Sequence, residues 1–293
     1  MLNQTSFKLT NSVNGNIDFQ YFEFDGNSFF NRIQRNNYFS LIWVTEGSGT
    51  VKADFSEYDF KENSLFALAP YQPFMISSRE QIKGIAIYFH ADFFCIHKHH
   101  KEVTSNGVLY NNVYQPPFVA VDESSSATLK MLCEQIKAEM QNPALAQYEL
   151  LVSYLKIFLI TAARLKKEQM IENSEPKAEV KEPYILQKLK DFIEANYKEK
   201  HSASEYAELL NITPKALAKI TKNSFNKTIT DLISERIIIE AKRELYMSDK
   251  LIKEIAFELG YPDEYYFSRF FKKYAEVSPQ AYRDTVGFAR AVA

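Results

Sequence analysis

The stretch GYPDEYYFSRFFKKYAEVSPQAYR, residues 260–283, decides how the second half of the chain folds. It places five aromatic residues between Tyr265 and Phe271, next to basic side chains. Four rings recur at i, i+3, i+4 and i+7, the spacing of one helix face: Phe267, Phe270, Phe271 and Tyr274. We therefore predict a helix with a buried aromatic stripe, rather than a stacking platform for bases or a ligand pocket. Tyr265 falls on the other side with Arg269, where its ring would either help this helix to enter a groove or hinder it.

A helix-turn-helix pattern precedes this stretch in SASEYAELLNITPKALAKITKNSFNKT, residues 202–228. Ser202 is followed three residues later by Glu205, which is the capping-box pattern that begins a helix. Thr213 and Pro214 are residue types preferred at the N-cap and first position of a second helix. We therefore predict two helices joined by a short turn.

The same pattern recurs about 50 residues later. Ala207 to Ala256 is a step of 49 residues, and Leu217 to Phe267 is a step of 50. Residues 229–248 between the two units predict one helix of roughly 18 residues, or about 27 Å. Successive major grooves of B-DNA lie about 34 Å apart. The spacing predicts two units that could enter adjacent major grooves of double-stranded DNA.

Basic and polar side chains on the second helix of each unit are the candidate DNA contacts. In the first unit the candidates are Thr213, Lys215, Lys219 and Lys222. In the second unit they are Asp263, Glu264, Tyr265, Ser268, Arg269, Lys272 and Lys273. Arg269 is the first candidate for specificity because arginine bonds guanine through two hydrogen bonds, whereas lysines add mainly salt-dependent affinity. A lysine-rich helix face can also be plain solvated surface.

The second half of the chain also resembles the C-terminal domain of the AraC/XylS family of bacterial transcription regulators, over about 100 residues. The residues that carry the resemblance are Arg236, Ala241, Leu245, Ile252, Glu254, Ile255, Ala256, Gly260, Tyr261, Phe267, Arg269, Phe271, Lys272, Lys273, Ser278, Pro279, Tyr282 and Arg283. Three positions depart from the family pattern. Thr221 replaces a usual aromatic residue, Asn226 a usual glycine and Tyr265 a small polar residue. Asn226 is a mild change because asparagine tolerates the left-handed conformation.

The resemblance implies an α+β multidomain regulator with a cupin-like β-barrel at the N-terminus, then helices that form a homodimer. Residues 1–123 also predict a barrel directly, since short strand-like segments alternate with turns such as EGSG at 46–49. Amphipathic spacing predicts two helices in 124–167, the expected dimerisation segment. The charged segment 168–183 is expected to be a linker, and 184–293 the double helix-turn-helix domain. RNA polymerase would be a further partner if the protein is an activator.

Metal-dependent catalysis in the barrel is not expected. A metal-binding cupin needs two or three histidines and a carboxylate on facing strands, but none of the five histidines lies within residues 41–89. We therefore predict no enzymatic activity, no metal and no cofactor. The cluster CIHKHH, with Cys95, His97, His99 and His100, has zinc-type ligands without a known spacing, so it is either a solvated loop or a metal site.

Aromatic residues of the predicted strands are the candidate lining of an effector pocket. They are Trp43, Phe66, Tyr71, Phe74 and Tyr88. The same alternation is typical of a plain hydrophobic core, and the sequence permits a small-molecule effector or none at all. No cluster of arginines indicates an anionic ligand.

Composition limits the remaining classes of protein. The chain has 293 residues, a net charge of −2 and two cysteines, which predicts more than one domain and no disulfide framework. The first residues do not predict a signal peptide, and the most apolar run, 150–163, is too short to span a bilayer. We therefore expect a cytoplasmic, sequence-specific DNA-binding regulator with no membrane partner. The alternative is a β-barrel metabolite-binding protein or enzyme with a helical protein-interaction module.

Overall fold

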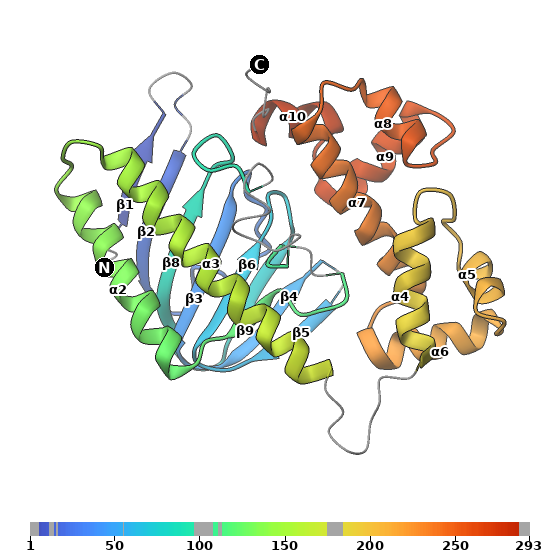
Figure 1. Cartoon of the computed structure of the whole chain (residues 1–293), viewed down its shortest axis with the longest axis horizontal. Coiled ribbons are helices and arrows are strands. Elements are labelled where there is room, and N and C mark those ends of the chain that lie inside the picture. The colour runs from blue at the N-terminus through green and yellow to red at the C-terminus, as the bar shows by residue number, and fades with distance from the viewer. Residues whose placement is uncertain are drawn as a thin grey trace. The chain divides into compact units, whose positions relative to one another are not determined.

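The computed structural model describes residues 6–11, 15, 17–54, 56–96, 108–110, 113–174 and 184–286. The chain divides into two compact units. The first is formed by Met1–Asn112 and Pro116–Gln169, and the second by Val113–Gln115 and Met170–Ala293. As the sequence predicts, the first unit is rich in strands and the second is built from helices (Figure 1).

Two antiparallel sheets form most of the first unit. The larger sheet has the strand order β1-β2-β8-β3-β6-β9, and the smaller has the order β5-β4-β7. The strands are β1 (Ser6–Thr10), β2 (Ile17–Asp25), β3 (Phe39–Glu46), β4 (Gly49–Ala53), β5 (Ser56–Phe60), β6 (Ser64–Leu68), β7 (Phe74–Ser77), β8 (Lys83–Phe89) and β9 (Phe118–Ala120). The predicted turn at 46–49 lies where β3 ends and β4 begins.

The hydrophobic core of the first unit includes buried side chains from both sheets. Ile42 and Val44 of β3 share one buried cluster with Val51 of β4 and Phe74 of β7. Successive side chains of a strand point to opposite faces of its sheet. Trp43, which is also buried, therefore lies on the other face of the larger sheet.

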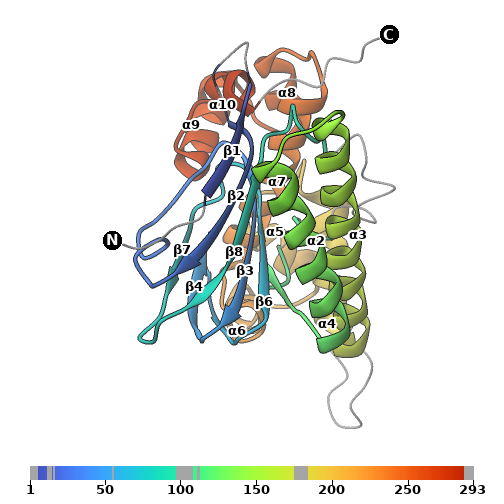
Figure 2. The same ribbon diagram turned by 90° about the vertical axis from the view of Figure 1, so that its left-hand side faces the viewer.

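Two helices cover that other face. Figures 1 and 2 show α2 (Glu123–Gln141) and α3 (Gln147–Ser174) side by side along the larger sheet. Lys137 of α2 forms an ion pair of 2.7 Å with Glu23 of β2. Lys166 of α3 is buried, and its Nζ donates a hydrogen bond of 2.6 Å to the carbonyl oxygen of Pro116. Burial lowers the pKa of the Lys166 ammonium to about 7.

Helix α3 continues to Ser174, past residue 168, where the sequence predicts the linker to begin. The segment 168–174 is polar, but it consists mainly of glutamate, glutamine, methionine and other residues that a helix accepts, without glycine or proline. Polarity alone therefore misplaces the start of the linker. The rest of the predicted linker, 175–183, lies outside the described residues.

The second unit consists of seven helices in the part of the chain that the structure describes. They are α4 (Tyr184–Asn196), α5 (Ala203–Leu209), α6 (Pro214–Phe225), α7 (Ile229–Met247), α8 (Ile252–Glu258), α9 (Glu264–Ala275) and α10 (Pro279–Val286). Figure 1 shows α7 running from the α5–α6 pair to the α8–α9 pair. This is the predicted arrangement of two helix-turn-helix units joined by one long helix.

Among the described residues, no helix combines the length and the apolar character that a membrane span requires.

Candidate nucleic-acid interface

Local side-chain contacts fix the start of both helices of the first helix-turn-helix unit. Ser202 and Glu205 form the predicted capping box at α5. Thr213 caps α6, where its Oγ1 accepts a hydrogen bond of 3.2 Å from the backbone N–H of Ala216. Asn226 is the C-cap of α6 and has a left-handed φ of 52°, which asparagine tolerates. These contacts set where the exposed face of α6 begins and ends.

The second unit repeats this local design. Asp263 caps α9, where its Oδ1 accepts a hydrogen bond of 2.6 Å from the backbone N–H of Tyr266. The sequence predicts that Asp263 faces the groove, whereas in the structure its carboxylate caps its own helix. Glu276 is the C-cap of α9 and also has a left-handed φ, of 61°.

The two turns share a hydrogen bond at equivalent positions. The backbone N–H of Ile212 donates to the carbonyl of Ala207 at 3.0 Å, and that of Tyr261 donates to the carbonyl of Ala256 at 2.9 Å. Both donors and both acceptors are 49 residues apart, since 261 − 212 and 256 − 207 are each 49. The internal repeat is therefore present in the backbone geometry as well as in the sequence.

Helices α6 and α9, the second helices of the two units, each have one buried and one exposed face. Leu217 of α6 and Phe267 and Phe271 of α9 are fully buried, whereas Phe270 and Tyr274 are half-buried. The predicted stripe is thus present, but its rings differ in depth. Most of the candidate DNA contacts lie on the exposed faces: Thr213, Lys215, Lys219, Lys222, Asp263, Tyr265, Arg269, Lys272 and Lys273. Glu264 and Ser268 are half-buried.

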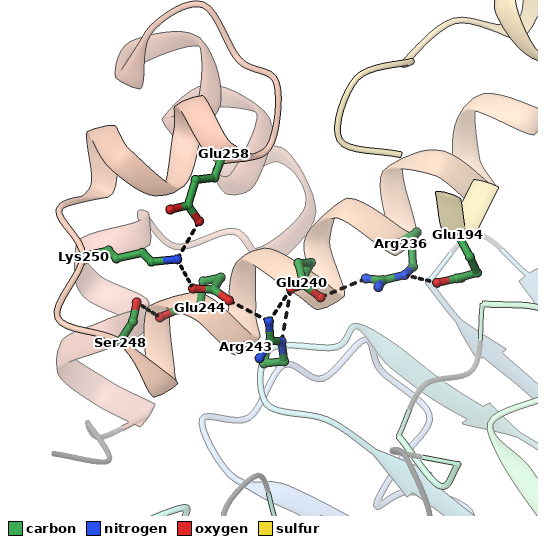
Figure 3. Close-up of polar contacts among 8 residues, drawn as sticks. All are labelled: Glu194, Arg236, Glu240, Arg243, Glu244, Ser248, Lys250 and Glu258. Carbon is green, nitrogen blue, oxygen red and sulfur yellow. Dashed lines mark hydrogen bonds and ion pairs between the residues drawn. The ribbon is translucent and has the colours of Figure 1, made fainter. Parts of the chain in front are cut away.

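Acidic residues neutralise basic side chains of the connecting helix α7 and of the segment that follows it (Figure 3). Arg236 pairs with Glu194 of α4 at 2.8 Å and with Glu240 at 3.2 Å. Arg243 pairs with Glu240 and Glu244. Lys250 continues the chain of ion pairs to Glu244 at 3.0 Å and to Glu258 of α8 at 2.6 Å. This network connects α4 to α8 along the length of α7.

The pKa of Glu240 reflects this network. Burial acts to raise the pKa of its carboxyl group, but hydrogen bonds and charges from Arg243 and Arg236 outweigh burial and hold the pKa below its usual range. Glu240 is therefore ionised at neutral pH and keeps both arginines paired.

The cations of α6 and α9 contrast with those of α7. Within the described parts of the chain, no ion pair is formed by Lys215, Lys219, Lys222, Arg269, Lys272 or Lys273. The second unit thus neutralises arginines along its connecting helix and leaves positive charge on the two helices that could enter DNA grooves. Phosphate oxygens are the natural partners of such side chains.

A lysine without a role in the sequence analysis is buried. Lys227 follows α6 and pairs with Glu235 of α7 at 2.7 Å. Its Nζ also donates a hydrogen bond of 3.1 Å to the carbonyl of Val113, a residue of the same compact unit. The lysine-rich sequence around α6 gives no sign that this one cation is internal, because its acidic partner lies eight residues away, beyond a turn.

The candidate effector residues of the first unit do not all lie in one place. Phe66, Phe74 and Tyr88 lie in the buried cluster that both sheets share, and burial raises the pKa of the Tyr88 hydroxyl. Trp43 lies on the opposite face of β3, because its neighbour Ile42 faces the shared cluster. Tyr71 is half-buried and has a left-handed φ of 54° in the connection between β6 and β7.

The candidate zinc ligands cannot be placed. His97, His99 and His100 lie outside the described residues, whereas Cys95 is half-buried. In the described ranges, no group of three or more His, Cys, Asp or Glu side chains is arranged to hold a metal ion.

Comparison with known proteins agrees with the helical architecture. A family model described as a helix-turn-helix domain matches residues 206–285. The HTH-type transcriptional activator Btr of Bacillus subtilis is 32% identical over 84 residues, which cover 29% of this chain and 16% of Btr. The chain thus spans less than a fifth of that relative. A solved structure of ToxT from Vibrio cholerae O395 aligns with 97% of this chain and 97% of the ToxT chain, at 15% identity and a TM-score of 0.39.

A relative from Pseudoalteromonas carrageenovora is covered more completely. It is an uncharacterized HTH-type transcriptional regulator encoded in the cgkA 5' region, and it is 31% identical over 125 residues. These residues cover 42% of this chain and 74% of the relative. With this relationship, the matching family model and the two helix-turn-helix units joined by α7, the chain belongs to the AraC/XylS family of DNA-binding transcription regulators.

Proposed function

We propose that this protein binds specific sequences in double-stranded DNA by placing α6 and α9 in adjacent major grooves. The observation that carries this proposal is the distribution of charge: cations on α6 and α9 lack acidic partners in the described part of the chain, whereas arginines of α7 are paired. Helix α7 has 19 residues, which is about 28 Å. That length suits the distance of about 34 Å between successive major grooves.

The two recognition helices offer different chemistry to DNA. The charged side chains on the exposed face of α6 are lysines, which suit phosphates and contribute salt-dependent affinity. Helix α9 presents Arg269, whose guanidinium can donate two hydrogen bonds to one guanine. We therefore assign affinity mainly to Lys215, Lys219 and Lys222, and base discrimination mainly to Arg269.

The binding experiment begins with the full chain selecting duplexes from a random pool. Fluorescence anisotropy at several salt concentrations then measures affinity for the selected duplex and its single-base variants. We expect the logarithm of the binding constant to fall linearly with the logarithm of salt concentration. Lys219→Ala should reduce that slope by about 1, equally for all variants. Lys130→Ala, an exposed lysine of α2, is the control that leaves the slope unchanged.

Arg269→Ala tests specificity. The expected loss is about 1–3 kcal/mol, concentrated at one base position. A uniform loss across the variants would assign Arg269 to phosphate instead. If the chain binds no duplex in a salt-dependent way, the regulator proposal fails and the protein-interaction alternative replaces it.

The proposal includes a homodimer that forms through α3. Leu150, Ile157 and Ile171 are exposed on this helix at steps of 7 and 14 residues. Seven residues are nearly two helical turns, so the three side chains lie along one stripe, the pattern of a helix–helix seam. Sedimentation at micromolar concentration should show a dimer that Ile157→Lys converts to a monomer. Leu251→Lys, which changes an exposed apolar residue of the second unit, should leave the dimer intact.

The proposal also makes the first unit the sensing domain. Phe66, Phe74 and Tyr88 are the rings that a small apolar effector would contact, because they come from both sheets and share one cluster. An effector bound there should raise the thermal unfolding temperature of the protein, and Phe74→Ala should abolish that increase. An increase that survives in Phe74→Ala would place the effector elsewhere.

A further inference from the structure

A series of neighbouring aromatic rings extends from the core of the second unit to Arg269. Tyr261, at the turn before α9, is buried, and its ring centroid lies 5.7 Å from that of Tyr266. The guanidinium carbon of Arg269 lies 5.8 Å from the centroid of the Tyr266 ring. Tyr266 therefore contacts both a buried ring of the core and the exposed cation.

Three neighbouring rings hold Tyr261 in place. Its ring packs against Phe267 at a centroid distance of 5.4 Å and against Phe270 at 5.0 Å. The ring of His201, in the connection before α5, lies 5.2 Å away. Because Tyr261 is held by three rings, it gives the partly exposed ring of Tyr266 a fixed surface to pack against.

A cation–π contact suits an arginine that reads bases better than an ion pair would. Arg236 lies over the Tyr197 ring, 4.0 Å from its centroid, but like Arg243 it also pairs with carboxylates, which neutralise the charge and occupy N–H donors. An aromatic ring contacts the flat face of the guanidinium. The N–H donors lie in the guanidinium plane, so they remain available for a base. Within the described ranges, Tyr266 is the partner found for Arg269, which forms no ion pair there.

We propose that Tyr266 is a positioning residue that orients the Arg269 guanidinium for contact with one base pair. This inference rests on the proposed function, since it assumes that α9 enters a major groove. An exposed arginine samples many rotamers, and a partner that restricts them before binding reduces the entropy lost in the complex. The neighbouring Tyr265 offers the matched comparison, because it is 82% exposed on the same helix without a ring contact to Arg269 in the described residues.

The test measures discrimination by the full chain at the base position where Arg269→Ala loses affinity. Tyr266→Leu should reduce the ratio of affinities for the preferred and substituted base pair about three- to thirtyfold, the range that corresponds to a cation–π contact. Tyr266→Phe keeps the ring and should keep the ratio. Arg269→Lys keeps the charge but lacks the planar donor group, so it should lower the ratio of affinities. In Tyr266→Leu/Arg269→Ala, the loss should equal that of Arg269→Ala alone.

Several outcomes would overturn the positioning role. One is a Tyr266→Leu variant that loses affinity equally for all duplexes, and another is a Tyr266→Phe variant that behaves like Tyr266→Leu. Additive losses in the double variant would also show that the two residues act separately. Tyr265→Leu should combine additively with Arg269→Ala, and coupling as strong as that of Tyr266 would remove the special role of Tyr266.

The same measurements separate this inference from the proposed function. A position-specific loss in Arg269→Ala with an unchanged ratio in Tyr266→Leu overturns the positioning role alone. A uniform loss in Arg269→Ala overturns the base contact and the positioning role together.

Discussion

The Nζ of Lys227 lies 2.7 Å from Oε2 of Glu235, and the two side chains expose only 3% and 7% of their surface. This buried ion pair joins the connection that follows the recognition helix α6 to the connecting helix α7. It therefore fixes the C-terminal end of α6 against α7.

Removing one partner of this pair should be strongly destabilising. Lys227→Met removes the ion-pair partner of the buried Glu235 carboxylate, and we expect the free energy of unfolding to fall by about 3–5 kcal/mol. Urea unfolding monitored by far-UV circular dichroism measures the change in the helical unit. Lys222→Met, which changes an exposed lysine of α6, is the control and should change stability by less than about 0.5 kcal/mol. Equal effects of both variants would contradict the importance of the pair.

The N-cap of α9 can be separated from DNA contact. Asp263→Ala removes the acceptor for the Tyr266 N–H and should cost about 0.5–2 kcal/mol of unfolding free energy. Asp263→Ser keeps a capping oxygen without the charge and should restore most of that stability. If both variants are equally unstable, the carboxylate charge matters more than the cap.

Gly260 should not tolerate a side chain. It has a φ of 79°, and a Cβ at this position would lie 1.9 Å from the carbonyl oxygen of Lys198. Gly260→Ala should therefore destabilise the second unit by more than about 1 kcal/mol. Gly15→Ala is the matched control, because Gly15 has a φ of 72° but no heavy atom of the described residues lies within 4 Å of the point that a Cβ would occupy. Thermal unfolding of the two variants separates the steric clash from the backbone strain, because both variants have the strain and only Gly260→Ala has the clash. A similar loss of stability in both variants would show that the clash contributes nothing.

Lys166 should give the first unit an unusual dependence on pH. Burial lowers the pKa of its ammonium to about 7, whereas the unfolded chain has an ordinary lysine pKa of about 10.4. Below pH 7 both states are protonated, and the cost of burying the charge is fully present. Between about pH 7 and 10 the unfolded state binds more protons, so the unfolding free energy should rise by up to about 1.4 kcal/mol per pH unit.

Trp43 is the one tryptophan in the sequence and lies in the first unit, so its fluorescence reports unfolding of that unit. Lys166→Met should remove the rise in stability above pH 7. Lys167→Met, which changes the adjacent exposed lysine, should keep it. A flat profile in the unmodified protein would show that Lys166 titrates normally.

Much of the second unit could be predicted because its signals are local. The Ser202–Glu205 capping box and the Thr213 cap join residues three positions apart, and a side chain reaches a backbone N–H at that distance within one helical turn. The spacing of Phe267 and Phe271 likewise indicates a helix face before any partner is known. The same reasoning identified the candidate DNA contacts on α6 and α9, because the helical period places them opposite the buried residues.

Other features depended on packing between distant residues. Helix α3 passes the predicted start of the linker because polar residues with high helix propensity are compatible with either state. The two faces of the larger sheet separate Trp43 of β3 from Phe66 of β6, although both are buried aromatic residues. The aromatic composition of the strands cannot show this separation without the strand register.

By itself, the sequence determined the helical repeat, its caps and the exposed cations of the recognition helices, since each depends on contacts or periodicity within a few residues. Only the tertiary structure decided which cations are neutralised. Lys227 is buried against Glu235, Arg236 reaches Glu194 on another helix, and Arg269 lies against Tyr266. The physical reason is that charge pairing depends on distances across a turn or between helices, which only packing of the helices against one another can set.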